Sequence, residues 1–116
     1  MQQLVEEAIA KISGETVTVQ AAGRTDAGVH ALGQVVSFDL SKAWDPFRIR
    51  EALNFHTKPH PVAVVEAGAV PDTFEARFSA LARHYEYRIL NRRGRPALED
   101  KRVWHCPMAL DAEAMH

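Results

Sequence analysis

Apolar and polar side chains alternate with a helical period over the first dozen positions of the chain. The residues that share the apolar face are Leu4, Val5, Ala8, Ile9 and Ile12. Glutamate and lysine side chains fall on the opposite face, so the pattern predicts an amphipathic helix over residues 3–12. Ser13 and Gly14 follow directly, and this pair predicts the end of the helix.

Two strand-like runs follow, over residues 16–21 and 35–40. The first alternates and is rich in β-branched side chains, which favour strands. The second places apolar residues on one face and polar residues on the other, so the two runs predict an antiparallel hairpin. Hairpin loops hold roughly 2 to 5 residues, and the stretch from Ala21 to Ala31 is about twice that length. Long loops held by a rigid sheet often carry functional side chains.

A second helix is predicted to begin at Asp45 and Pro46. An aspartate N-cap followed by proline at the first helical position is a strong start signal. The helix runs to about Asn54 and is expected to bury Ile49 and Leu53.

Shorter patterns assign the remaining segments. They are an extended connection over residues 56–61, a short strand over 62–66, a strand over 83–90, a basic turn over 91–96, a strand over 103–108 and a helix that begins at 111. The order is helix, strand, strand, helix, strand, strand, and one further strand in front would give the ferredoxin-like arrangement. Since the first helix has no apolar element ahead of it to cover, we expect that the first strand is missing.

Composition indicates one ordinary globular domain over residues 1–116, with 47% hydrophobic and 25% charged residues. The net charge of -1 does not by itself indicate a nucleic-acid partner. Residues 83–102, however, hold seven Lys or Arg against three acidic residues. Such a basic segment favours contact with phosphate, and the alternative is a solvated strand and loop.

Cys106 is the single cysteine, which excludes an internal disulfide and favours a reducing compartment. No apolar run approaches the ~20 residues of a membrane span, and nothing at the start resembles a signal peptide, so we expect a cytoplasmic protein with no membrane partner. No metal site is predicted. Pro59 separates His56 from His60, and the adjacent His105 and Cys106 have no partner pair at zinc spacing.

Residues 23–30 read Gly-Arg-Thr-Asp-Ala-Gly-Val-His. This stretch closely resembles, without a gap, the signature of the tRNA pseudouridine synthase A (TruA) family. Residues 76–87 read Ala-Arg-Phe-Ser-Ala-Leu-Ala-Arg-His-Tyr-Glu-Tyr and resemble its second signature. The resemblance implies an α+β fold with an RRM-like, ferredoxin-like antiparallel sheet backed by helices. It also implies that residues 1–116 form a truncated catalytic domain that lacks the family's opening strand and second half.

The same resemblance implies three catalytic residues, Asp26, Arg24 and Tyr85. Asp26 would be the catalytic aspartate, acting at C6 of the base or at the ribose, and an aspartate is ionised at neutral pH without special activation. Arg24 would enter the space left by the flipped uridine and pair with Asp26. Tyr85 would stack on the target base and assist deprotonation. The alternatives are a carboxylate that caps its own turn, a surface salt bridge, and a pair of core aromatics formed by Tyr85 and Tyr87.

Five further residues are expected to contact RNA or to hold the loops that do: Arg77, Arg83, His30, Arg92 and Arg93. Arg77 and Arg83 lie within the second signature and would bind RNA phosphate or hold the loop itself. His30 belongs to the first signature and is expected to fix its loop rather than to ligate a metal. His84 replaces an arginine that is often found in the family, which removes one RNA contact but no catalytic role.

The function implied by the resemblance is isomerisation of uridine to pseudouridine in the anticodon stem-loop of tRNA, at family positions 38–40. The family needs no cofactor and works as a homodimer that holds tRNA in its clefts. Two alternatives remain: a non-catalytic RNA-binding module with Tyr85 and Tyr87 as a stacking platform, and an inactive oligomerising fragment. We expect the isolated chain to lack activity and to self-associate through its open sheet edges.

Overall fold

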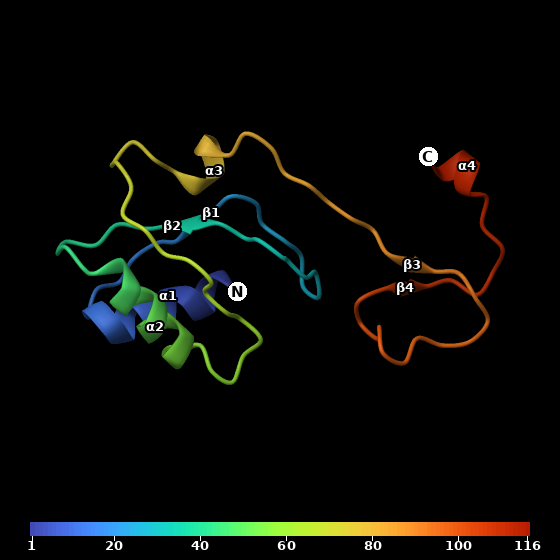
Figure 1. Ribbon diagram of the computed structural model, residues 1–116, viewed down its shortest axis with the longest axis horizontal. Helices are drawn as coiled ribbons and strands as arrows, with labels where there is room; N and C mark the ends of the chain where they lie inside the picture. Colours follow the sequence, from blue (N-terminus) through green and yellow to red (C-terminus); the bar gives the residue numbers. More distant parts are fainter. The chain divides into compact units, whose positions relative to one another are not determined.

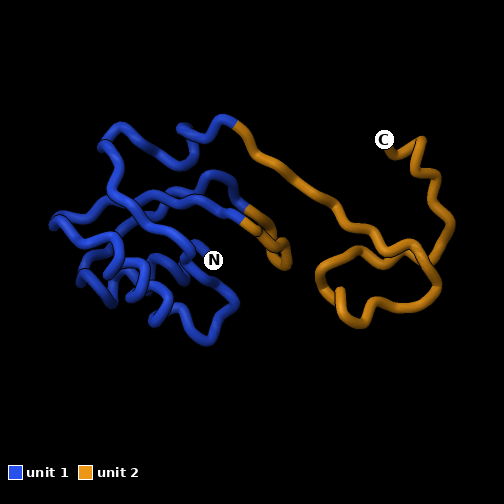
Figure 2. Tube along the Cα trace, viewed as in Figure 1, with its two compact units in different colours: residues 1–24, 33–81 blue, residues 25–32, 82–116 orange.

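The computed structural model describes residues 1–116, which form two compact units (Figure 2). Unit 1 comprises residues 1–24 and 33–81, and unit 2 comprises residues 25–32 and 82–116. The elements in chain order are α1 (Gln2–Ser13), β1 (Gln20–Ala21), β2 (Val36–Ser37), α2 (Pro46–His56), α3 (Ala76–Ser79), β3 (Ile89–Leu90), β4 (Trp104–His105) and α4 (Ala112–Met115) (Figure 1). The α+β class is confirmed.

Helix α1 confirms the first predicted element, including its end. Gly14 follows the helix with a φ of 72°, in the left-handed region that glycine adopts without a steric penalty. Its N–H donates to the carbonyl of Ala10 over 2.9 Å. The hydroxyl of Ser13 turns back to the carbonyl of Ile9. The Ser-Gly pair therefore ends the helix by satisfying backbone groups that would otherwise lack partners.

Strands β1 and β2 form the predicted antiparallel hairpin, with Gln20 opposite Ser37 and Ala21 opposite Val36. The regular pairing is much shorter than the two predicted runs. The N–H of Val19, just before β1, donates to the side chain of Glu6. The burial pattern still alternates as predicted, because Val19 is only 1% exposed while its neighbours in the sequence lie at the surface.

Helix α2 begins as predicted at the cap. The carboxylate of Asp45 accepts the N–H of Phe47 over 3.0 Å, and proline occupies the first helical position. Helices α1 and α2 pack side by side in Figure 1. The buried residues of the core come from both helices and the hairpin: Val5, Ala8, Ile9, Val19, Ile49 and Leu53. Each buried Val, Ile or Leu side chain contributes roughly 1.5–3 kcal/mol, so this core holds the base of the long loop in place.

Two predictions for the rest of unit 1 were wrong, and one short helix was not predicted. Residues 62–66 form no strand, because the amide of Asn54 takes both backbone groups of Val64. Residues 56–61 make a turn closed by the N–H of His60 on the carbonyl of Thr57, rather than an extended connection. The short helix α3 occupies a segment for which no helix was predicted.

In unit 2, β3 and β4 pair in parallel, with Ile89 opposite Trp104 and Leu90 opposite His105. The strands predicted over 83–90 and 103–108 shrink to these short pieces, and the parallel pairing differs from the expected antiparallel sheet. A parallel pair needs a connection of about a dozen residues or more, which the intervening chain supplies. Asn91 then ends the pairing, since its side chain donates to the carbonyls of Cys106 and Met108.

Helix α4 begins at the cap residue Asp111, whose carboxylate accepts the N–H of Ala114. None of the helices is both long enough and apolar enough to cross a lipid bilayer. The ferredoxin-like arrangement and the single-domain assignment over residues 1–116 stay predictions.

Candidate functional site

The loop that carries the first signature leaves the hairpin at a well-defined base. Beyond the last regular pair, the N–H of Ala22 donates to the carbonyl of Val35 over 2.8 Å. One step further, Nε2 of Gln34 donates to the carbonyl of Gly23 over 2.6 Å. Arg24 follows directly in the sequence. The hairpin therefore holds both ends of the loop through backbone and side-chain bonds.

Asp26 begins a tight turn within unit 2. The N–H of Val29 donates to the backbone carbonyl of Asp26 over 3.2 Å. Gly28 has a φ of 84° within this turn, a conformation that an L side chain rarely adopts. The side chain of Asp26 is exposed and accepts no hydrogen bond. The backbone thus closes the turn, and the carboxylate remains available to a substrate instead of capping its own turn.

Arg24 and Tyr85, the other two predicted catalytic residues, also present open side chains. Arg24 is exposed and takes part in no hydrogen bond or ion pair. Tyr85 is 68% exposed and Tyr87 is 90% exposed, so neither ring belongs to the core. The alternative of two core aromatics does not hold for this chain. The structure shows no hydrogen bond between Asp26 and Tyr85, and the catalytic roles of all three residues stay predictions.

His30 fixes the signature loop within unit 2. Its Nε2 lies 3.2 Å from the carbonyl oxygen of Lys101. Since a carbonyl oxygen only accepts, this contact requires the proton on Nε2. His30 thereby joins the loop to a distant part of the sequence, which agrees with its expected loop-fixing role.

Arg92 organises the basic turn in which it lies. Its Nε donates to the carbonyl of Gly94 and its Nη2 to the carbonyl of Arg95, both over 3.1 Å. The carbonyl of Arg92 in turn accepts Nε2 of His105 over 2.8 Å. Sequence reasoning missed this closing role of Arg92. Arg93 is exposed and its guanidinium makes no such bond, so it is the more open cation.

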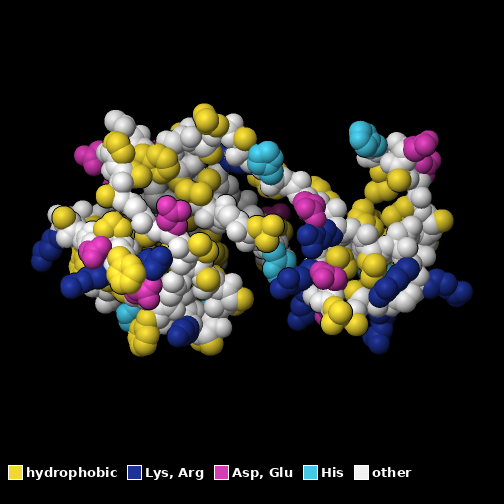
Figure 3. Space-filling view, viewed as in Figure 1, with side chains coloured by type: hydrophobic (Ala, Val, Ile, Leu, Met, Phe, Trp, Pro, Cys, Tyr) yellow, Lys and Arg dark blue, Asp and Glu magenta, His cyan; other side chains and the backbone are white.

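The basic side chains of residues 83–102 gather around β3 and β4, where Figure 3 shows them in dark blue. Nε of Arg88 donates to the carboxylate of Glu86, and this hydrogen bond raises the pKa of Arg88. The carboxylate of Glu86 therefore offsets part of the positive charge of this guanidinium. The basic turn that follows β3 holds the cations without an acidic partner.

Helix α3 carries Arg77 and is anchored through its first residue. Ala76 is 2% exposed, and its N–H donates to Oγ of Ser37 over 2.9 Å. The guanidinium of Arg77 lies 5.3 Å from the ring centre of Phe78. Arg77 and Arg83 both take part in interactions within the structure, so each has a positioning contact in addition to any role toward RNA.

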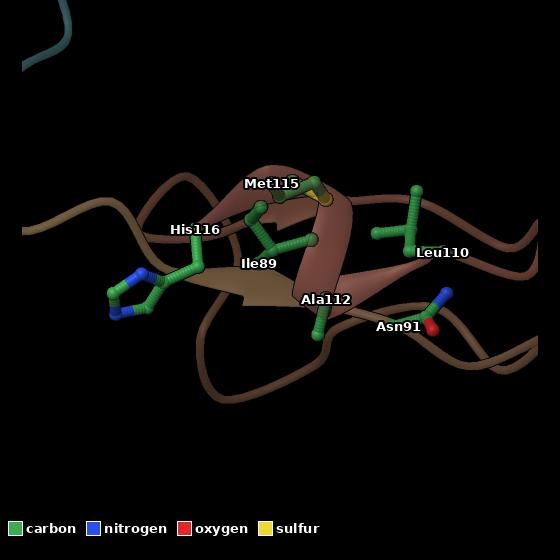
Figure 4. A pocket seen from close by; sticks show the side chains of 6 residues that line it. All are labelled: Ile89, Asn91, Leu110, Ala112, Met115 and His116. Carbon is green, nitrogen blue, oxygen red and sulfur yellow. The ribbon is translucent and has the colours of Figure 1, made fainter.

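A hollow of about 330 Å³ lies at the end of unit 2. The lining residues are Ile89, Asn91, Leu110, Ala112, Met115 and His116. Figure 4 shows Ile89 close beneath Met115, while the ring of His116 points away. The lining is mainly apolar and contains none of the predicted site residues, so we do not assign it to the candidate site. No group of three His, Cys, Asp or Glu side chains is placed to hold a metal ion.

The chain is similar to known proteins over its whole length. A family model described as tRNA pseudouridine synthase matches residues 1–79. The tRNA pseudouridine synthase A of Rhodospirillum centenum is 59% identical over all 116 residues, which cover 47% of that protein. The corresponding proteins of Methylobacterium sp. (strain 4-46) and Rhodopseudomonas palustris (strain BisB5) are 57% and 55% identical, again over the whole chain, which covers 46% and 47% of their lengths. The chain thus spans about half the length of these curated relatives, and it belongs to the tRNA pseudouridine synthase family.

Proposed function

We propose that this chain carries the catalytic loop of an enzyme that isomerises uridine to pseudouridine in the anticodon stem-loop of tRNA. The observation that supports the proposal most directly is the carboxylate of Asp26. It lies exposed and unbonded on a turn that the backbone closes without it. It also lies within an eight-residue signature of the family to which the chain belongs.

The reaction breaks the bond between N1 of uracil and C1′ of ribose and forms a new bond from C5 to C1′. The proton leaves C5 and N1 gains one, so substrate and product have the same composition. An ionised carboxylate beside the base and sugar suits this chemistry, either as a nucleophile at C6 or as a group acting at the ribose. We assign that role to Asp26.

A uridine within a stem-loop must leave its stack before it can react, which costs a few kcal/mol. We assign to Arg24 the space that the base vacates, since its guanidinium is exposed and makes no ion pair. We assign to Tyr85 a stacking contact with the flipped base. Its ring is 68% exposed, which leaves a face for such a contact.

RNA phosphate would be bound by the cations of α3 and of unit 2, namely Arg77, Arg83 and Arg93. His30 and Arg92 would hold the loops that present them, as their hydrogen bonds indicate. We further propose that the whole protein acts in the cytoplasm as a homodimer with a ferredoxin-like sheet. The 116-residue chain alone is expected to lack turnover, because it spans about half the length of its relatives.

A non-catalytic RNA-binding module is the second candidate. The exposed rings of Tyr85 and Tyr87 favour it, because aromatic side chains on an open segment can stack on unpaired bases. Asp26 distinguishes the two functions, since a binding module gains nothing from a carboxylate near phosphate.

The deciding experiment measures tritium release from tRNA that carries 5-tritiated uridine, with this sequence assayed in a protein of the relatives' full length. Asp26→Asn and Asp26→Ala should abolish release while tRNA affinity stays within a few-fold of the unsubstituted protein. Asp39→Asn, at an exposed position beyond β2, is the matched control and should retain full activity. Tritium release by Asp26→Ala would overturn the assignment.

A further inference from the structure

We propose that Gln34 is a positioning residue for the loop that carries Arg24 and Asp26. The proposal rests on the proposed function. Its basis is a pair of hydrogen bonds at the loop base: Nε2 of Gln34 donates to the carbonyl of Gly23 over 2.6 Å, and Oε1 accepts the N–H of Val35 over 3.2 Å. The side chain is half-buried, and the bond to Gly23 is partly shielded from water, whereas the bond from Val35 is exposed.

These two bonds lie where the pairing of the hairpin ends and the loop begins. The ladder runs from the pair of Ala21 and Val36 to the bond between Ala22 and Val35. At the next step the amide of Gln34 reaches across the hairpin to the carbonyl of Gly23. The side chain thereby adds one cross-strand bond to the hairpin, immediately before the chain enters the loop.

Glutamine suits this position because one side chain must both donate and accept. Its amide offers two N–H donors and a carbonyl oxygen. An ionised glutamate of the same length keeps the acceptor for Val35 but has no donor for Gly23. Methionine has nearly the same length and flexibility but forms neither bond. These two substitutions therefore separate the donor from the acceptor without opening a large void.

Fixing the carbonyl of Gly23 restricts the peptide that leads directly into Arg24. Catalytic groups that shift by about 1 Å can lose 10²-fold in rate even when the change lies outside the reacting atoms. The affinity for tRNA depends on phosphate contacts elsewhere in the chain, so it should change much less than kcat. A positioning role thus predicts a loss in kcat with little change in KM.

The test compares Gln34→Met and Gln34→Glu with Gln20→Met, in a protein of the relatives' full length. Gln20 lies in β1 of the same hairpin, but its side chain is exposed and makes no hydrogen bond. We expect kcat for pseudouridine formation to fall by roughly 10- to 100-fold in both Gln34 variants. KM for tRNA should stay within about two-fold, and Gln20→Met should match the unsubstituted enzyme in both constants.

Hydrogen exchange supplies a readout that does not depend on activity. The amides of residues 24–33 should exchange faster in both Gln34 variants than in Gln20→Met, while the amides of α1 and α2 stay protected. Unchanged kcat and unchanged exchange in Gln34→Met, with an active unsubstituted enzyme, would overturn the positioning role alone. An inactive unsubstituted enzyme would overturn the proposed function and this role with it. Faster exchange throughout the hairpin and α1 would show a general structural role instead and would also overturn the proposal.

Discussion

The N–H of Val19 donates to Oε1 of Glu6 over 3.0 Å, and this bond joins the hairpin to α1. Gln2 donates to the same carboxylate from one turn earlier in the helix. The bond from Val19, and after it the bond from Gln2, lowers the pKa of Glu6. A single acidic side chain thus anchors the strand that leads toward the signature loop.

Stability should depend on the ionisation of Glu6. Because its pKa is lower in the folded chain, its contribution is complete above the pKa of the unfolded chain and is lost as pH falls through the folded pKa. Glu6→Gln should therefore lower Tm at neutral pH and flatten the decline of Tm on acidification. Thermal melts between about pH 7 and pH 3 measure both effects.

Glu7→Gln is the control for that experiment, since the carboxylate of Glu7 accepts only from Gln3 on the surface of α1. It should leave the acid dependence of Tm nearly unchanged. Equal effects of the two substitutions would show that the bond between Glu6 and Val19 contributes nothing specific.

Asn54 should be important for stability although it lies outside the apolar core. Its Nδ2 donates to the carbonyl of Val64 over 3.0 Å, and its Oδ1 accepts the N–H of Val64 over 2.7 Å. Asn54→Ala leaves both backbone groups without a partner, and an unsatisfied polar group costs about 1–3 kcal/mol when it is shielded from water. We expect the free energy of unfolding to fall by about that amount, measured by urea denaturation.

Asn54→Asp separates the two bonds, because aspartate keeps the acceptor for the N–H of Val64 but loses the donor. Its loss of stability should lie between those of the parent and Asn54→Ala. A loss in Asn54→Asp as large as that in Asn54→Ala would show that the bond to the N–H contributes little.

Periodicity and capping rules predicted the elements that depend on local sequence. Helix α1 ends at Gly14, and α2 begins at Asp45, because each boundary is set by one residue's own backbone or side chain. The hairpin was also predictable, since its alternating pattern leaves only one face to bury. These features need no knowledge of distant partners.

The misassigned segments depend on distant partners. The N–H of Val19 bonds to Glu6 in α1, and Asn54 bonds to Val64 in place of a neighbouring strand. Neither contact has a signature in the local sequence. In the candidate site, the family signature in the sequence identifies Asp26. The bond of Gln34 to Gly23, in contrast, is seen only in the structure.

Turnover should require the planar guanidinium group of Arg24 and not only its positive charge. Lysine at this position keeps the positive charge but cannot offer the planar set of donors that arginine presents. Arg24→Lys in a protein of full family length should lower kcat by about 10-fold or more, because the support for the flipped base is lost. Single-turnover assays of pseudouridine formation measure the change. Arg48→Lys, at an exposed position in α2, is the control and should retain full activity. Full activity in Arg24→Lys would show that the positive charge alone is sufficient for turnover.

The hydroxyl and the ring of Tyr85 should have separable effects. Tyr85→Phe keeps the stacking surface, so tRNA affinity should stay within a few-fold while turnover falls. Tyr85→Ala should weaken affinity as well, by about 1–3 kcal/mol if a base stacks on the ring. Tyr87→Phe is the matched control at another exposed tyrosine of the same segment. Full turnover in both Tyr85 variants would remove this residue from the site.

The salt dependence of tRNA binding should report on the basic turn after β3. Each phosphate contact that is lost makes the slope of log affinity against log salt less negative by roughly 0.7 to 0.9. Arg93 and Arg95 are exposed, and no hydrogen bond engages their guanidinium groups, so Arg93→Gln with Arg95→Gln should change the slope by roughly 1.4 to 1.8. Arg92→Gln differs because this side chain holds the turn through the carbonyls of Gly94 and Arg95. Arg92→Gln should therefore lower tRNA affinity at every salt concentration, with a smaller change of slope. An unchanged slope in the double variant of Arg93 and Arg95 would show that the turn is solvated and does not contact phosphate.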